Sequence, residues 1–346
     1  MKTLPILVTG AAGFIASRWV QSCLKRGISV IAVDDLTYFS NRKELQNIFS
    51  ENSKNYGVEA VVPGQALPKP NPPLRVERKE LFSWLQKESP QLQAVVHLGA
   101  CTDTTELDVA LLNCWNLEYS QKLWQWCTSH HVPLVYASSA ATYGAGELGY
   151  DDEEALLQKL KPLNPYGESK HHFDLWALSE ERQAKAPPVW SGFKFFNVYG
   201  FGELHKEKMA SVILHAFHQI QQTGRVKLFR SYRSEILHGH QARDFIFVDD
   251  VIRVLWFALE KPIRRGIFNL GTGQARTYLD LVKAVFHTLG VSENIEFIDM
   301  PSDLKDRYQY FTEAKMQKLK SEGYLLPFTS LESGVAQYVR ALQQQS

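Results

Sequence analysis

The chain contains little cysteine and none of the cysteine spacings that usually bind a metal. Its 346 residues include four cysteines, and no two of them form a C-x-x-C pair. Cys101, Cys114 and Cys127 follow one another at equal intervals, which suit neither a zinc site nor the disulfide framework of a small secreted domain. We therefore expect reduced thiols, a cytoplasmic location and no bound metal.

The chain also lacks an excess of charge and a long apolar run. Its formal net charge of +1 predicts no general attraction to nucleic acid or to a membrane. Residues 4–16 superficially resemble a short secretory signal, but Gly10 and Gly13 interrupt them, and no other segment approaches the roughly 18 apolar residues of a membrane span. We expect neither a membrane nor a nucleic-acid partner. The length suggests about two domains.

A strand, a glycine turn and a helix follow one another at the start of the chain. Residues 4–9 form a short apolar run typical of a buried parallel strand, and a helical pattern follows Ala16. Gly10 and Gly13 lie between them, where small residues let the backbone approach a pyrophosphate and the helix N-terminus offers N–H donors. This order predicts a dinucleotide-binding turn, with Ala16 in the place of the usual third glycine.

The next strand indicates where the adenosine half of the cofactor would bind. Residues 28–33 are apolar and end at Asp34 and Asp35, and an acidic residue in this place usually accepts hydrogen bonds from the ribose. Arg42 and Lys43 follow, and a basic group there could neutralise a ribose 2′-phosphate. These two residues favour NADP, but a solvated helix start explains them equally well, so NAD stays open.

A third buried strand is expected over residues 92–98. Gly99, Ala100 and Cys101 follow it and are small enough to lie beside a cofactor. His97 ends the strand, and we interpret it as a packed core histidine. Residues 107–127 are predicted to form a long helix whose aromatic residues belong to the core or to a subunit interface.

The segment from Asn164 to Lys170 carries the clearest catalytic pattern. Asn164 is a helix N-cap residue and Pro165 suits the first helical position, where a missing N–H costs nothing. Tyr166 and Lys170 are then one turn apart on the same helix face. An ammonium group near a phenol favours the phenolate and draws its pKa of about 10 toward working pH. Ser139 ends an apolar strand and could hydrogen-bond the same reacting oxygen as Tyr166.

The second half of the chain continues to alternate between strands and helices. We expect a strand over residues 192–196 and an amphipathic helix over 211–222. Further strands are predicted at 225–229, 244–248 and 266–270, and further helices near 277–289, 312–322 and 331–344.

The glycine turn together with Ser139, Tyr166 and Lys170 resembles the extended branch of the short-chain dehydrogenase/reductase superfamily, and the resemblance extends over nearly the whole chain. Other segments are more specific, and they are similar to the family of ADP-glycero-manno-heptose 6-epimerases. These segments are 99–106 (GACTDTTE), 136–144 (YASSAATYG), 196–200 (FNVYG), 205–211 (HKEKMAS), 243–245 (RDF) and 304–309 (LKDRYQ).

The resemblance implies an α/β fold, in which a Rossmann-type doubly wound parallel sheet is joined to a smaller, discontinuous α/β substrate domain. The expected NAD(P)-binding domain comprises residues 1–196 and 243–272, and the expected substrate domain 197–242 and 273–346. The resemblance also implies a role in lipopolysaccharide core biosynthesis and a homo-oligomer, for which a pentamer is one arrangement.

The resemblance assigns roles to individual residues. Lys206 would be a second catalytic acid/base facing Tyr166 across the sugar, with Ser139 and Lys170 completing the catalytic group. The expected cofactor-binding residues are Gly10, Gly13, Phe14, Ile15, Asp34, Asp35, Arg42, Lys79, Leu98, Gly99, Ala100, Cys101, Thr102, Asn116, Tyr166, Lys170, Val198 and Lys206. The expected substrate-binding residues are Ser139, Asn197, Lys208, His215, Phe229, Arg230, Arg243 and Tyr308.

The implied reaction inverts carbon 6 of the heptose in ADP-D-glycero-D-manno-heptose. That carbon has no adjacent carbonyl, so its C–H is not acidic and simple deprotonation is excluded. A bound nicotinamide can instead take the hydride and return it to the opposite face of a transient ketone. The oxygen then needs a proton partner in each of two orientations, which Tyr166 and Lys206 would supply.

Two other interpretations remain. One is a C4 epimerase or a 4,6-dehydratase of the same branch. However, a dehydratase places acidic residues where Ala140 and Ala141 stand, and a C4 epimerase does not need Lys206. The other is a non-catalytic NAD(P)-binding sensor. Such a protein does not need Tyr166 or Lys170, and this chain has both.

The chain departs from the family pattern in two places. The family's acidic-glycine-serine run is Arg230-Ser231-Tyr232 here, with a longer loop up to Arg243, and Lys208 replaces a small hydroxyl residue.

Overall fold

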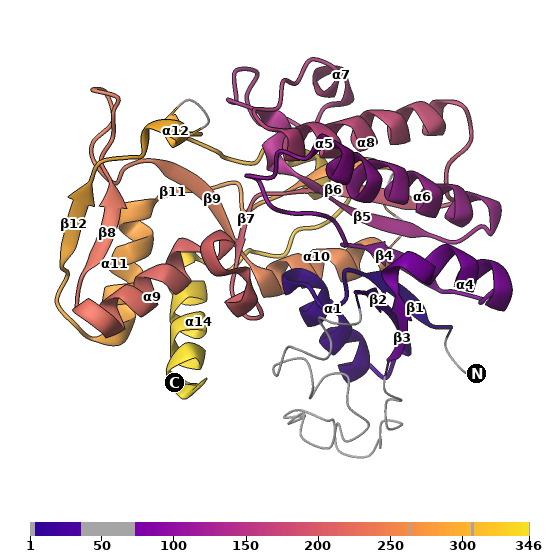
Figure 1. Ribbon diagram of the computed structural model, residues 1–346, viewed down its shortest axis with the longest axis horizontal. Coiled ribbons are helices and arrows are strands. Elements are labelled where there is room, and N and C mark those ends of the chain that lie inside the picture. Colours follow the sequence, from indigo (N-terminus) through magenta and orange to yellow (C-terminus); the bar gives the residue numbers. More distant parts are fainter. Residues whose placement is uncertain (1–3, 36–72, 262, 264, 306–307, 346) are drawn as a thin grey trace.

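The computed structural model describes residues 4–35, 73–261, 263, 265–305 and 308–345 (Figure 1). Its main feature is a parallel sheet of seven strands in the order β10-β6-β5-β4-β1-β2-β3. The strands are β1 (Ile6–Thr9), β2 (Val30–Asp34), β3 (Leu74–Glu77), β4 (Ala94–His97), β5 (Leu134–Ser139), β6 (Trp190–Phe195) and β10 (Gly266–Leu270). The short apolar runs of β1, β2, β4 and β10 are fully buried, as expected of a sheet covered by helices on both sides, whereas half of the edge strand β3 is exposed.

Helices cover the two faces of this sheet (Figure 1). On one face α1 (Phe14–Lys25) packs against α10 (Val248–Glu260), where the Trp19 and Trp256 rings lie 4.3 Å apart. On the other face α6 (Tyr119–Ser129) packs against α8 (Pro165–Arg182), and Trp124 meets Phe173 edge to face. The doubly wound Rossmann-type sheet predicted from the sequence is confirmed.

Short elements connect the strands and helices of the large sheet. Their bounds are η1 (Arg78–Glu80), α4 (Leu81–Glu88), α5 (Val109–Leu112), η2 (Asn113–Glu118), η3 (Ala140–Tyr143) and α7 (Glu154–Leu157). The predicted helix over 107–127 therefore begins at Val109 and is interrupted by the π-helical turn η2 before it continues as α6. Such single π turns occur often at functional sites.

The later part of the chain forms smaller sheets and a second apolar cluster. One sheet has the order β11-β9-β7, and β8 pairs in parallel with β12. The strands are β7 (Asn197–Tyr199), β8 (Val226–Phe229), β9 (Ala242–Phe247), β11 (Ala275–Thr277) and β12 (Ile295–Ile298). The accompanying helices are η4 (Leu204–Met209), α9 (Val212–Thr223), α11 (Tyr278–Leu289), α12 (Ser302–Lys305), α13 (Gln317–Ser321) and α14 (Leu331–Gln345). The cluster packs α9, α11 and α14 together, away from the large sheet (Figure 1).

The sequence prediction was wrong over residues 312–322, where only Gln317–Ser321 is helical. Thr312 N donates to the Ala242 carbonyl at 3.2 Å, and Ala314 N donates to Asp244 Oδ2 at 3.0 Å. These long-range hydrogen bonds hold the segment extended beside β9, so tertiary contacts override the local helical pattern. Strand β12 was not predicted either.

Within the described part of the chain, no helix combines the length and the apolar character that crossing a membrane requires.

Candidate active site

The glycine turn lies where β1 and β4 end side by side. Gly10 has a φ of +67°, and a Cβ atom there would lie 2.6 Å from the Gly99 Cα. Gly13 N donates to the Gly10 carbonyl at 2.7 Å and closes the turn before α1. The backbones of two strands can approach this closely only when both residues are glycine. The turn and Gly99 after β4 are therefore in direct backbone contact, and together they are called the glycine cradle.

Asp34 braces this turn from the end of β2. Its Oδ2 accepts a hydrogen bond from Ala12 N at 2.9 Å, and its Oδ1 accepts one from Asp35 N at 2.7 Å. Burial raises the pKa of the Asp34 carboxyl, while these hydrogen bonds and nearby Arg78 oppose the rise. Asp34 is thus fixed against the turn, with half-buried Asp35 next to it.

Arg78 is a residue near this turn that the sequence analysis missed. Its guanidinium lies 3.9 Å from the centre of the Trp115 ring, and its Nε is buried without a hydrogen-bond partner among the described residues. Lys79, which the resemblance suggested, is exposed, and Arg42 and Lys43 lie outside the described residues. The only sequence signal for Arg78 is its position directly after β3.

Asn116 joins the loop after β4 to α8. Its Oδ1 accepts from Cys101 N at 2.8 Å, and its Nδ2 donates to the Cys101 carbonyl and the Ser169 hydroxyl, both at 3.0 Å. Ser169 in turn donates to the Tyr166 carbonyl at 2.7 Å. The π turn η2 places Asn116 at this junction, where it is almost fully buried. Ala100 is half-buried and Thr102 is exposed.

His97 is confirmed as a packed core residue. Its Nδ1 lies 2.6 Å from Thr9 Oγ1, and its Nε2 lies 2.8 Å from Ser120 Oγ. Burial lowers its pKa to about 3 with a smaller contribution from Lys170, so the ring is neutral near pH 7.

The predicted start of α8 at Asn164 and Pro165 is confirmed. Asn164 Oδ1 accepts from Gly167 N at 2.8 Å, and Pro165 follows as the first helical residue. This cap fixes α8 so that Tyr166 and Lys170 both face inward, where each is over nine-tenths buried. Lys170 Nζ donates to the Ala137 carbonyl at 3.0 Å and so connects the helix to β5.

The protonation behaviour of the pair differs from the sequence expectation. Burial raises the pKa of the Tyr166 phenol above its ordinary value, and a hydrogen bond with Ser139 opposes the rise. Burial also lowers the pKa of the Lys170 ammonium to about 8, opposed by Asp174. Desolvation is therefore the dominant effect at both groups. Lys170 donates to a carbonyl of β5, and Ser139 is the group that favours the phenolate form of Tyr166.

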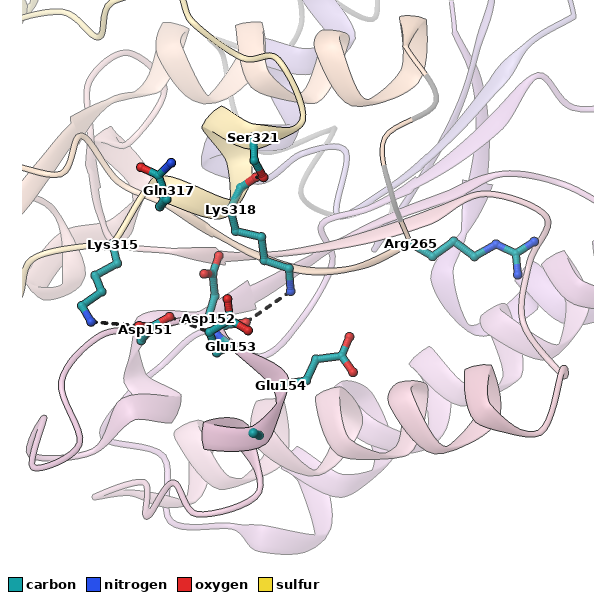
Figure 2. A pocket seen from close by; sticks show the side chains of 10 residues that line it. Asp151, Asp152, Glu153, Glu154, Arg265, Lys315, Gln317, Lys318 and Ser321 are labelled. Carbon is teal, nitrogen blue, oxygen red and sulfur yellow. Dashed lines mark hydrogen bonds and ion pairs between the residues drawn. The ribbon is translucent and has the colours of Figure 1, made fainter.

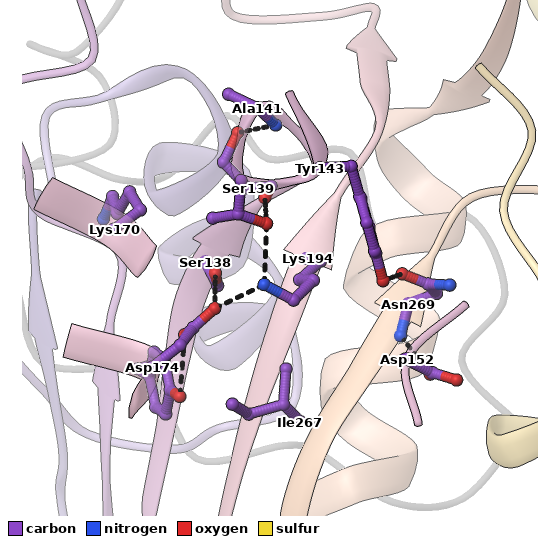
Figure 3. Close-up of polar contacts among 12 residues, drawn as sticks. Ser138, Ser139, Ala141, Tyr143, Asp152, Lys170, Asp174, Lys194, Ile267 and Asn269 are labelled. Atoms are coloured by element: carbon purple, nitrogen blue, oxygen red, sulfur yellow. Dashed lines mark hydrogen bonds and ion pairs between the residues drawn. The ribbon is translucent and has the colours of Figure 1, made fainter. Parts of the chain in front are cut away.

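A buried ion pair lies beneath these residues (Figure 3). Lys194 Nζ is 2.5 Å from Asp174 Oδ2, and both side chains are fully buried. Tyr136 and Ser138 donate to the same carboxylate at 3.0 and 2.7 Å, and Lys194 also donates to Thr142 at 2.7 Å. The network connects β5, β6 and α8 directly below Ser139 and Lys170.

Lys206, which lies in η4, comes close to the glycine cradle. It is half-buried in η4, and its Nζ lies 5.4 Å from the centre of the Phe14 ring at the start of α1. Burial lowers the pKa of its ammonium, and Glu203 opposes the shift. The structure thus brings Lys206 to the glycine turn even though the two are far apart in the sequence.

Arg243, on the central strand β9 of the three-stranded sheet, lies close to Tyr308. The Arg243 guanidinium lies 5.2 Å from the centre of the Tyr308 ring and 5.7 Å from that of Tyr278. Arg230 is exposed and lies 3.3 Å from Asp299. The other expected substrate residues lie on separate elements: Asn197 on β7, Lys208 on η4, His215 on α9 and Phe229 on β8. Of the expected cofactor residues, half-buried Ile15 and Val198 lie at α1 and β7, and half-buried Leu98 directly follows β4.

A separate recess near the start of β10 contains charges of both signs (Figure 2). Lys315 pairs with Asp151 at 2.8 Å, and Lys318 Nζ donates to the Ile267 carbonyl at 2.9 Å. Lys315 is thus paired and Lys318 is held by backbone carbonyls, and none of the predicted site residues lines the recess.

The glycine cradle and the Tyr166–Lys170 helix agree with a match to a known family. The model of the NAD dependent epimerase/dehydratase family matches residues 6–271. The chain belongs to this family. Its match includes the glycine turn, Ser139, Tyr166, Lys170 and Lys206.

Two curated relatives of the epimerase/dehydratase family are similar over nearly their whole length. An ADP-L-glycero-D-manno-heptose-6-epimerase of Fusobacterium nucleatum is 40% identical, with 97% of each chain covered. One of Nitratidesulfovibrio vulgaris strain DP4 is 43% identical, with 96% of each covered.

Solved structures of the family agree with the fold. The Helicobacter pylori ADP-L-glycero-D-manno-heptose-6-epimerase has a TM-score of 0.74 at 25% identity and covers 99% of this chain and 97% of its own. A UDP-N-acetylglucosamine 4-epimerase of Methanobrevibacter ruminantium has a TM-score of 0.77 at 20% identity, with full coverage of both chains. At that identity the second likeness supports the fold alone.

Proposed function

We propose that the protein inverts carbon 6 of the heptose in ADP-D-glycero-D-manno-heptose and so gives ADP-L-glycero-D-manno-heptose. The observation that carries this proposal is the similarity, at 40% identity over nearly full length, to a relative of that name. The site supports it because Lys206 lies close to Phe14 at the glycine turn. Tyr166 is buried on α8, and Asn116 joins Ser169 of that helix to Cys101 in the loop after β4. The runner-up remains another nucleotide-sugar enzyme of the same family.

The described residues fit a nicotinamide dinucleotide. A Cβ at Gly10 or Gly13 would clash with neighbouring backbone, so the turn requires glycine at both positions, as the glycine turn of a dinucleotide site does. When bound, the cofactor supplies hydride transfer to and from carbon 6. The chain's own residues would bind the dinucleotide at the glycine turn, orient the sugar, and exchange a proton with its oxygen through Tyr166 or Lys206.

The reaction is tested with purified protein and ADP-D-glycero-D-manno-heptose. We expect the two C6 epimers to appear together, as separated by chromatography, with no net change in the oxidation state of the cofactor. Conversion of a UDP-hexose at carbon 4, with the heptose left unchanged, would instead establish the runner-up.

The cofactor is expected to remain with the protein through purification. Denaturing the pure protein should release a nicotinamide dinucleotide that mass spectrometry identifies, and we propose NADP because of Arg42 and Lys43. Release of NAD alone would reverse that preference. If no dinucleotide is released and none binds on titration, the proposed chemistry is wrong.

The proposal also includes the setting of the reaction. We place it in the cytoplasm, as a step that supplies heptose for the lipopolysaccharide core, and we propose a homo-oligomer, whose subunit number light scattering measures directly. The division into an NAD(P)-binding part (1–196, 243–272) and a substrate part (197–242, 273–346) stays a proposal.

A further inference from the structure

Glu203 is a fully buried carboxylate that connects two elements of the molecule. Its Oε2 accepts from Ser211 N at 2.7 Å, and its Oε1 accepts from the Ser211 hydroxyl at 2.6 Å. Gly200 N also donates to Oε1, at 3.3 Å. Gly200 directly follows β7 and Ser211 caps α9, so the carboxylate ties together the two ends of the segment that carries Lys206.

The segment between Gly200 and Ser211 holds Lys206 close to the glycine cradle. Lys206 N donates to the Glu203 carbonyl at 2.9 Å, and the Lys206 ammonium lies over the Phe14 ring. Glu207, the next residue, has φ 46° and ψ −117°, a conformation that residues other than glycine rarely adopt. Such strain persists only where the surroundings impose it, and strained residues are concentrated at functional sites. Glu203 supplies that constraint from inside the protein.

The carboxylate and the ammonium also interact through space. Burial raises the pKa of the Glu203 carboxyl and lowers the pKa of the Lys206 ammonium, and each of the two groups opposes the shift of the other. From α14, Tyr338 faces Glu203, but burial keeps the pKa of its phenol far above its ordinary value, so it stays neutral. From α1, Arg18 lies 5.0 Å from the Phe201 ring and pairs with Asp249 at 2.8 Å. Glu203 is thus the acidic group that acts on Lys206.

We propose that Glu203 is a positioning residue that fixes Lys206 at the glycine cradle and keeps its ammonium protonated. The inference rests on the proposed function, in which Lys206 exchanges a proton with the sugar oxygen. A lysine whose ammonium lost its proton at working pH could not act as the acid in one of the two directions. The buried carboxylate opposes that loss of charge without occupying the site itself.

The test is a direct titration of Lys206 in the intact protein. Lysine amines carrying ¹³C-methyl groups give resonances that move with charge, and the resonance absent from Lys206→Met identifies Lys206. In Glu203→Gln we expect its pKa to fall by about one unit, because an opposite charge that favours the ammonium is removed. The alkaline limb of the epimerisation pH profile should move to lower pH by a similar amount.

Glu207→Gln is the matched control, because it removes the same charge from the exposed neighbour of Lys206. Its Lys206 resonance should titrate within a few tenths of a unit of the wild type. An unchanged Lys206 pKa in Glu203→Gln would overturn the inference, even if Lys206 proves catalytic. Conversely, normal epimerisation by Lys206→Met would overturn the catalytic assignment while leaving the electrostatic result intact.

A reciprocal measurement covers the case in which Glu203→Gln does not fold. Coupling between two charges acts equally on both, so removing the Lys206 ammonium must disfavour the Glu203 carboxylate. In Lys206→Met labelled with ¹³C at the glutamate carboxyl carbon, the Glu203 resonance should therefore titrate at higher pH than in the wild type. No change would contradict the proposal.

Discussion

Replacing Tyr166 with phenylalanine, or Lys206 with methionine, should each lower the rate of C6 epimerisation by roughly 10²–10⁴-fold. This is the usual contribution of a general acid–base group, and the proposed reaction needs one for each orientation of the ketone. The rate is measured on purified protein whose fold and bound dinucleotide are first shown to match the wild type. Lys206 is the more informative of the two, because a single tyrosine would suffice for a C4 epimerase.

A matched control separates this role from the general loss of a lysine. Lys227 on β8 is exposed and belongs to neither the cofactor-binding nor the substrate-binding residues. Lys227→Met should therefore change the rate by less than about twofold. A Lys206→Met enzyme that epimerises as fast as the control would refute the two-base assignment.

A substrate with an aldehyde at carbon 6 gives a sharper version of the same test. The aldehyde can dismutate without any change of the face that receives the hydride, so one acid–base group is enough. Each single variant should therefore keep much of the dismutation while losing epimerisation, and the double variant should lose both. Equal loss of both activities in a single variant would point to a damaged cofactor site instead.

Local patterns predicted two structural elements well. The order of strand, glycine turn and helix, and the Asn164-Pro165 cap, act within one turn of their own sequence position, and both were found as predicted. The same reasoning failed at residues 312–316, where hydrogen bonds to β9 outweigh the helical pattern.

Long-range contacts explain what the sequence could not reveal. Arg78 meets Trp115 only because folding brings the residue that follows β3 against η2. Glu203 and Ser211 are ordinary polar residues in the sequence, and only folding turns them into a buried clamp. The phenol of Tyr166 has a raised pKa because burial outweighs its polar neighbours, an effect that helix spacing does not show.

The buried pair Lys194–Asp174 is another long-range feature. Breaking it should lower the free energy of unfolding strongly. Lys194→Met would remove the cation and leave the Asp174 carboxylate in the core with only the Tyr136 and Ser138 hydroxyls as donors. Removing one partner of a buried ion pair typically costs about 3–5 kcal/mol. We expect the free energy of unfolding, measured by urea denaturation, to fall by about that amount.

The exposed pair Lys283–Glu293 provides the comparison, since its atoms are 3.4 Å apart and both side chains are about half exposed. Lys283→Met should cost at most about 1 kcal/mol, because water already screens the two charges. If Lys194→Met is no less stable than Lys283→Met, the Lys194–Asp174 pair does not stabilise the fold as a buried ion pair would.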